Sequence, residues 1–165
     1  KQILSSINYA KKIQEAILPK KDNMKTFFED FFIFYHPKDI VSGDFYWYRN
    51  YKNIAVIATV DCTGHGVPGG FMSMLGSLLL DKIVSESQLD CSEILKRLND
   101  EIIRVLDQYE GGEIQDGMDL SLCIIHKEKK EIYKKEKVNV LNVFRQKHYV
   151  KGKNGAKNVK MNMKD

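Results

Sequence analysis

The sequence is poor in cysteine, with three in 165 residues, and the three lie far apart. Cys62, Cys91 and Cys123 form no C-x-x-C pair and no closely spaced framework. A disulfide-stapled secreted scaffold and a zinc ribbon are therefore excluded. Because such a chain does not depend on oxidised cysteines, we expect a reducing, cytoplasmic compartment.

Long apolar runs are also missing. A membrane-spanning helix needs about 20 consecutive apolar residues, whereas the longest apolar stretch, at 70–80, contains serine and glycine and is followed by Asp81. The N-terminus has no charged segment followed by an apolar one, so it does not resemble a secretory signal. The first residue is Lys1 rather than Met, and we expect the sequence to be a piece of a longer chain.

The composition that remains is that of one globular domain, with 43% apolar and 29% charged residues. The net charge of +4 is unevenly spread. Residues 1–126 have a net charge of −5, with 13 basic and 18 acidic residues, while residues 127–165 have +9, with 13 and 4. A basic tail could bind nucleic acid, but this one lacks interleaved aromatic residues. We therefore regard it as solvated charge and nucleic-acid binding as unlikely.

The N-terminal 18 residues show the three- and four-residue spacing of an amphipathic helix, and Pro19 ends the pattern. A stripe this narrow suits a helix that packs on its own domain or one that pairs with a second helix. The sequence leaves both alternatives open, including a homodimer through this helix. The apolar positions are Ile3, Ile7, Ala10, Ile13 and Ile17.

The rest of the chain predicts an α+β fold with an antiparallel sheet and helices packed on it. Residues 20–26 are expected to be a polar connector and residues 61–70 a glycine-rich loop. Residues 151–165 have no apolar period and are expected to be disordered. The expected strands are 30–36, 43–48, 54–60 and 120–125, and the expected helices are 71–85 and 92–109.

Two acidic residues at strand ends are the candidates for a metal-binding site. Asp44 precedes an aromatic strand, and Asp61 follows a buried apolar one. A hard cation such as Mg²⁺ or Mn²⁺ would compensate two neighbouring carboxylates, although both could equally be turn residues that bond nearby amides. Cys62 and His65 alone do not make a four-ligand zinc set. The sequence contains neither a nucleophile elbow nor a phosphate-binding P-loop.

Four segments together resemble the SpoIIE/RsbU-type phosphatases, a bacterial branch of the metal-dependent PPM (type 2C) Ser/Thr protein phosphatases. The first, AKKIQEAILP at 10–19, is similar to the helix that precedes such domains. PKDIVSGDFYW at 37–47 and DCTGHGVPG at 61–69 are similar to the first two metal motifs, and DGMDLSLC at 116–123 is similar to the strand after the helices. Each segment alone is a weak signal, but their shared order and spacing make a strong one.

The resemblance implies a PPM-type αββα sandwich, in which helices flank two antiparallel sheets. It implies hydrolysis of phosphoserine or phosphothreonine on a regulatory protein, such as an anti-sigma-factor antagonist, by two Mn²⁺ or Mg²⁺ ions and a water they activate. By position, Asp44 would bind metal, Asp61 would be shared by both ions and the Cys62 backbone carbonyl would be a further ligand.

The resemblance also assigns a loop close to the substrate, comprising Gly64, His65 and Gly66. For His65 we favour a role in shaping this loop over contact with the substrate. Asp116 and Asp119 receive no metal role, because hydrogen bonds at a turn or strand end explain them better.

The resemblance fades after residue 132. We therefore divide the chain into a linker helix (1–19), the N-terminal part of a PPM domain (20–132) and a divergent basic tail (133–165). The tail does not read as further strands, and no Asp occurs between Asp119 and Asp165, so the late acidic metal ligands are missing. A frameshift and a true terminus both remain open. We expect weak metal binding and impaired activity; the alternative is a non-catalytic remnant of a signalling protein that binds a partner or dimerises.

Overall fold

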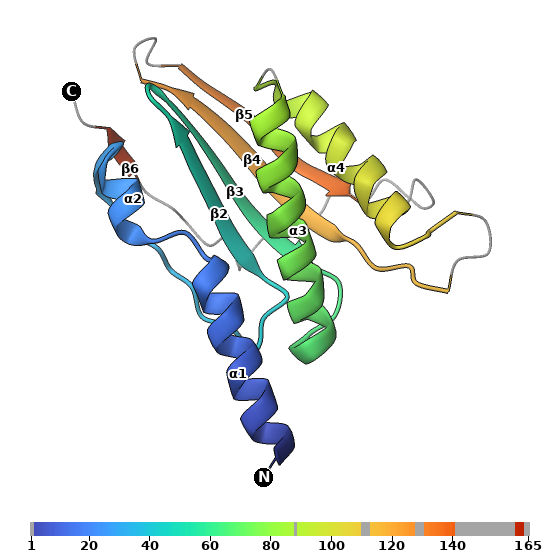
Figure 1. Cartoon of the computed structure of the whole chain (residues 1–165). Helices are drawn as coiled ribbons and strands as arrows, with labels where there is room; N and C mark the ends of the chain where they lie inside the picture. The colour runs from blue at the N-terminus through green and yellow to red at the C-terminus, as the bar shows by residue number, and fades with distance from the viewer. Residues whose placement is uncertain (1, 88, 110–112, 128–130, 141–160, 164–165) are drawn as a thin grey trace.

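The computed structural model of the chain describes residues 2–87, 89–109, 113–127, 131–140 and 161–163, and it is a mixture of helices and antiparallel strands (Figure 1). The helices are α1 (Gln2–Ile17), α2 (Lys21–Lys25), α3 (Gly66–Glu86) and α4 (Cys91–Val105). The strands are β1 (Phe28–Phe31), β2 (Phe45–Tyr51), β3 (Ile54–Cys62), β4 (Met118–His126), β5 (Glu131–Val140) and β6 (Met161–Met163). The α+β class expected from the sequence is confirmed.

The centre of the fold is an antiparallel sheet in the order β2-β3-β4-β5, with α3 and α4 across one face (Figure 1). Side chains alternate between the two faces of a strand, and the helix-facing residues of β3 include Val56, Ala58 and Val60. They pack with apolar residues of both helices, such as Leu80 and Ile94, in the main core. This core explains why the apolar run at 54–60 forms a buried strand.

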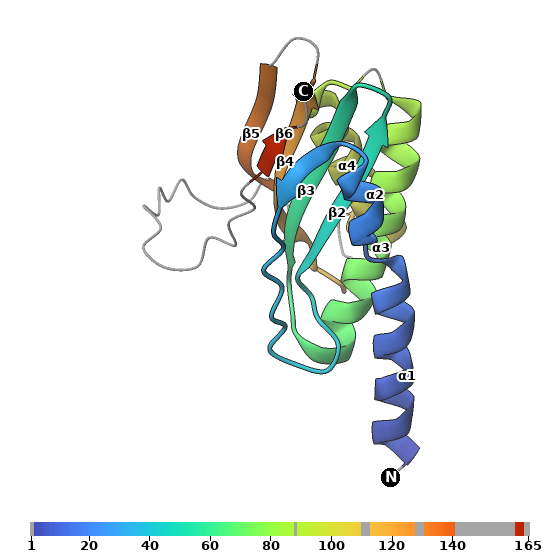
Figure 2. The same cartoon turned by 90° about the vertical axis from the view of Figure 1, so that its left-hand side faces the viewer.

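The opposite face of the sheet carries a second core, formed with α2 and β1 (Figure 2). Phe27 and Phe28 are buried there in an edge-to-face pair with ring centroids 4.9 Å apart, and Phe28 also lies against Tyr48 of β2. Burial of Met24 explains why the segment expected to be a polar connector forms the short helix α2 instead.

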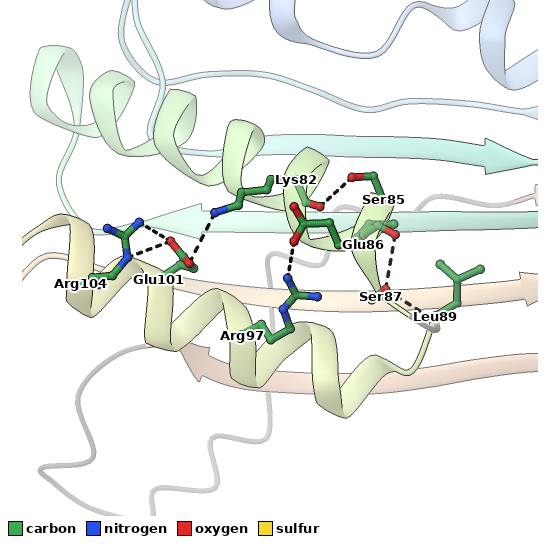
Figure 3. Close-up of polar contacts among 9 residues, drawn as sticks. Lys82, Ser85, Glu86, Ser87, Leu89, Arg97, Glu101 and Arg104 are labelled. Carbon is green, nitrogen blue, oxygen red and sulfur yellow. Dashed lines mark hydrogen bonds and ion pairs between the residues drawn. The ribbon is translucent and has the colours of Figure 1, made fainter.

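Polar contacts fix α3 against both its neighbours. On the sheet side, Trp47 Nε1 donates to Asp81 Oδ1 at 2.7 Å, and Arg49 pairs with Asp81 Oδ2 at 2.6 Å. On the other side, Glu86 pairs with Arg97 of α4 at 2.6 Å (Figure 3). By length and composition α3 could cross a membrane, but 56% of its apolar window is buried in the domain, as in the core helix of a soluble protein.

Three expected boundaries are wrong. The helix expected from residue 71 begins at Gly66, because Pro68 falls in its first turn, where the missing amide hydrogen has no helical partner. The strand expected at 30–36 is confined to Phe28–Phe31, since Phe32 and Phe34 are exposed. The helix expected at 92–109 is Cys91–Val105, and it is capped by Asp90, whose side chain accepts a hydrogen bond from the Glu93 amide.

The expectation of no further strands after residue 132 is also wrong. β5 pairs antiparallel with β4 along its whole length, and β6 pairs with β1. The lysines of β5 interrupt the apolar alternation by which a strand is predicted from sequence. Such charged residues are common in edge strands, where they discourage pairing with a further strand. Most of the segment expected to be disordered, 151–165, lies outside the described residues.

Candidate active site

Strand register brings the predicted acidic residues to one end of the sheet. Phe45, the first residue of β2, pairs with Val60 of β3, so Asp44 and Asp61 are each one residue beyond this pair, at the same end of the sheet. Phe45 and Val60 both face the helices. By alternation, Asp61 in β3 faces the other side of the sheet, where the second core lies further along the strands.

The thiol of Cys62 shows that the two carboxylates share one electrostatic environment. Burial, together with the negative charges of Asp61 and Asp44, raises the pKa of Cys62 to about 12. The thiol therefore stays protonated at neutral pH and is unsuited to be a thiolate ligand. Any ligand from this residue would be its backbone carbonyl, as the resemblance implies.

The backbones of the two motif loops are in direct contact. A Cβ atom at Gly43 would lie 2.8 Å from the Gly64 carbonyl oxygen and 3.3 Å from that of Cys62. One at Gly69, in the first turn of α3, would lie 2.7 Å from the same Gly64 oxygen. Only glycine allows this approach, which places the Cys62 carbonyl beside the loop that carries Asp44.

The loop expected to lie near the substrate has backbone torsions that glycine favours. Gly64 and Gly66 have φ values of +82° and +64°. Between them, His65 occupies the N-cap position of α3, and its Nδ1 lies 2.9 Å from Oδ2 of Asp39 in the first motif. This contact ties the two loops together, and a role for His65 toward a substrate stays a prediction.

Asp116 has the hydrogen-bonding role expected of it. Thr63 Oγ1 donates to Asp116 Oδ1 at 3.0 Å, and the Thr63 amide donates to the Gly117 carbonyl at 2.8 Å. These bonds join the loop after β3 to the chain that enters β4.

Asp119 is a residue whose position the sequence reasoning did not anticipate. It lies directly opposite Asp61 in the β3–β4 register. Met118 and Leu120 on either side of it face the main core, so Asp119 shares the face of Asp61. The alternation of Leu120, Leu122 and Ile124 with more polar residues was the signal that could have shown it.

The carboxylate and carbonyl oxygens at this site are of the type that a hard divalent cation prefers, but they are too few to complete its coordination. Carboxylate and carbonyl oxygens are the ligands that Mg²⁺ and Mn²⁺ prefer. Among the described residues, however, no three His, Cys, Asp or Glu side chains converge closely enough to hold an ion. The described part of the site offers a carboxylate pair with adjoining carbonyls, so water would have to complete the coordination.

The fold has a clear counterpart among solved structures. The SiaA-PP2C domain of Pseudomonas aeruginosa matches with a TM-score of 0.70 and 34% sequence identity, over 79% of this chain and 52% of that one. The chain has a partial PPM phosphatase fold. The resemblance to SpoIIE-like PPM phosphatases drawn from the motifs is thus confirmed.

The PP2C phosphatase domain of the cell-fate determinant SpoIIE from Bacillus subtilis also matches, at 26% identity over 62% of this chain and 29% of that one, with a TM-score of 0.48. No protein-family profile matches the sequence, and no curated protein does. This chain spans about half the length of the SiaA domain that it matches.

Proposed function

We propose that this chain is a signalling phosphatase domain that hydrolyses phosphoserine or phosphothreonine on a bacterial regulatory protein in the cytoplasm, with Mn²⁺ or Mg²⁺ as cofactor. The observation that supports the proposal is the approach of the two motif loops, in which Gly43, next to Asp44, lies against the Gly64 and Cys62 carbonyls that follow Asp61. An anti-sigma-factor antagonist is the kind of substrate that the family resemblance suggests.

Each residue has a defined task in this proposal. Asp61, at the end of β3, would be shared by two ions, while Asp44 and the Cys62 carbonyl would each hold one. When bound, the ions lower the pKa of a coordinated water and offset the charge of the phosphoryl oxygens. Gly64 and Gly66 hold the loop in the conformation that keeps the Cys62 carbonyl against Gly43.

The same geometry leads us to expect weak metal binding and impaired turnover. Two carboxylates and carbonyls are fewer fixed ligands than a pair of octahedral ions requires. Asp119 lies opposite Asp61, but among the described residues no three His, Cys, Asp or Glu side chains are close enough to hold one ion. No Asp occurs between Asp119 and Asp165.

The test is Mn²⁺ binding, followed by electron paramagnetic resonance of the free ion, together with Mn²⁺-dependent hydrolysis of a phosphopeptide. We expect weak Mn²⁺ binding that Asp61→Asn reduces at least about tenfold, as loss of a carboxylate ligand should. Asp100→Asn, an exposed Asp in α4, is the matched control and should bind as the wild type does. Asp119→Asn belongs in the same series because of its position opposite Asp61.

Equal Mn²⁺ binding by the wild type and Asp61→Asn would contradict the proposed metal site. Phosphopeptide turnover at the level of a complete phosphatase would contradict the expected impairment. Turnover that is low, Mn²⁺-dependent and lost in Asp61→Asn would support both.

A second candidate function is non-catalytic: a signalling remnant that dimerises or binds a partner through α1. The observation in its favour is the exposure of apolar side chains along this helix, including Ile3 at 78% and Tyr9 at 67%. Exposed apolar residues grouped on one element mark an interaction surface more often than singly scattered ones do.

A further inference from the structure

The chain leaves the central sheet at Thr63, directly after the carbonyl proposed to bind metal. The last pair of the β3–β4 register is Cys62 opposite Met118. The pairing continues by one hydrogen bond, because the Thr63 amide donates to the Gly117 carbonyl at 2.8 Å. In a regular antiparallel ladder the Gly117 amide would donate back to the Thr63 carbonyl. Here it donates to Thr63 Oγ1 instead, also at 2.8 Å, so a side chain takes the place of the backbone acceptor.

The Thr63 hydroxyl is itself held by Asp116. A hydroxyl has one hydrogen to donate and two lone pairs that accept. Oγ1 donates to Asp116 Oδ1 at 3.0 Å, and the Gly117 carbonyl is a second acceptor at 3.2 Å. The Asp116 carbonyl accepts a hydrogen bond from Nε2 of Gln108, a side chain that is only 7% exposed. We call the hydrogen bonds that join Thr63 to Asp116 and Gly117 the Thr63 clasp.

The Thr63 clasp determines which way the Cys62 carbonyl points. The peptide bond between Cys62 and Thr63 is trans, and in a planar trans peptide the carbonyl and the amide hydrogen point in opposite directions. Because the Thr63 amide hydrogen is directed at Gly117, the Cys62 carbonyl points away from the chain that enters β4. It lies on the side of the Asp44 loop, where a Cβ at Gly43 would be 3.3 Å from it.

We propose that Thr63 is a positioning residue for the candidate metal site, which directs the Cys62 carbonyl toward the Asp44 loop through the Thr63 clasp. The inference rests on the proposed function for its metal, but the clasp itself involves only this chain. Gly117 is buried, and a buried amide that loses its partner is costly. Without the hydroxyl, the contact with Gly117 should therefore rearrange and the peptide after Cys62 should no longer be held in one orientation.

The test observes the Cys62 carbonyl directly. Cysteine labelled with ¹³C at its carbonyl marks Cys62, Cys91 and Cys123, and in ¹⁵N-labelled protein each carbonyl is detected by NMR through the amide of the next residue. Mn²⁺ broadens the signals of atoms close to it, so the quantity measured is the Mn²⁺ concentration that halves each signal. We expect the Cys62 signal to be lost first. Cys91, at the start of α4, and Cys123, which pairs with Ile57, are internal controls.

Two variants of Thr63 separate the hydroxyl from the rest of the side chain. Thr63→Val keeps the shape and removes the hydroxyl, whereas Thr63→Ser keeps the hydroxyl. Loss of a group that orients a ligand typically lowers metal affinity about 10- to 100-fold. We therefore expect the Mn²⁺ concentration that halves the Cys62 signal to rise at least about tenfold in Thr63→Val, and to stay near the wild-type value in Thr63→Ser. Without metal, the amide of residue 63 should exchange its hydrogen faster in Thr63→Val only.

Further variants control for the loss of a hydroxyl and for general destabilisation. Thr26→Val removes an exposed hydroxyl that bonds the Asn23 carbonyl at the end of α2, and it should match the wild type in both readouts. Ile94→Val, in the main core, should lower the melting temperature without changing either readout. If Thr63→Val does not fold, Asp116→Ala removes one partner of the hydroxyl and should shift both readouts in the same direction by less.

The outcomes distinguish this inference from the proposed function. If Mn²⁺ broadens the Cys62 signal of the wild type and Thr63→Val needs no more Mn²⁺ than Thr63→Ser, the positioning role is overturned and the metal site stands. If Mn²⁺ does not broaden the Cys62 signal of the wild type ahead of the other two, the metal function fails. Faster exchange at residue 63 in Thr63→Val would then still support the Thr63 clasp, and unchanged exchange would overturn it as well.

Discussion

At the scale of single residues, the site and its surroundings hold polar groups in apolar settings. Cys62 is one case, since its buried thiol keeps the proton that a metal ligand would have to lose. Tyr48 is another: its hydroxyl is buried and has no well-formed hydrogen-bond partner among the described residues. Burial, which the nearby Thr26 offsets only in part, raises the pKa of Tyr48 to about 12.

We predict that Tyr48→Phe leaves stability at neutral pH within about 1 kcal/mol of the wild type, because it removes a buried hydroxyl that gains little from hydrogen bonding. The pKa of Tyr48 is higher in the folded chain than its ordinary value of 10.0. The unfolded chain therefore loses its proton first, and wild-type stability falls as the pH rises from 10 toward 12.

The stability of Tyr48→Phe should fall less steeply than that of the wild type over that pH range, as measured by urea unfolding at several pH values. Tyr9→Phe, at an exposed tyrosine, is the control and should follow the wild type. The prediction fails if Tyr48→Phe and Tyr9→Phe have the same alkaline profile, or if Tyr48→Phe is strongly destabilised at neutral pH.

At the scale of elements, the contact between α3 and α4 combines a buried apolar layer with surface ion pairs. Leu98 of α4 is fully buried in the main core, while its neighbour Arg97 pairs with Glu86 at the surface (Figure 3). We predict that Leu98→Ala costs about 2–5 kcal/mol of unfolding free energy and that Arg97→Ala costs about 1 kcal/mol or less. Chemical denaturation of both variants measures the difference, and equal losses would show that the ion pairs matter as much as the core.

The elements also show how far sequence reasoning reaches. The strand at 54–60 and the helix with Leu98 were predictable because their apolar periods reflect burial in the main core. The strand β5 was not, because pairing with β4 at a sheet edge leaves little apolar pattern. For the site, Asp44 and Asp61 were chosen from their motifs, but the position of Asp119 opposite Asp61 was missed, because it depends on how β3 and β4 pair.

At the scale of the whole molecule, the open question is whether α1 associates with a second copy of the chain. Its junction with the domain is polar, through Gln14, whereas Ile3, Leu4, Tyr9 and Ile13 are exposed. Burying such side chains against a second helix would remove apolar surface from water, at about 25 cal/mol per Å². The dimerisation hypothesis therefore predicts a molecular mass that rises with protein concentration.

Multi-angle light scattering over a concentration series measures this mass. Under the dimerisation hypothesis, Ile3→Glu should keep the chain monomeric at concentrations where the wild type is dimeric, because it sets a charge in the helix pair. Ile114→Glu places the same charge at an exposed isoleucine outside the helices, and it should dimerise as the wild type does. A wild type that stays monomeric throughout would contradict the dimer without affecting the phosphatase proposal, since Asp44 and Asp61 come from a single copy.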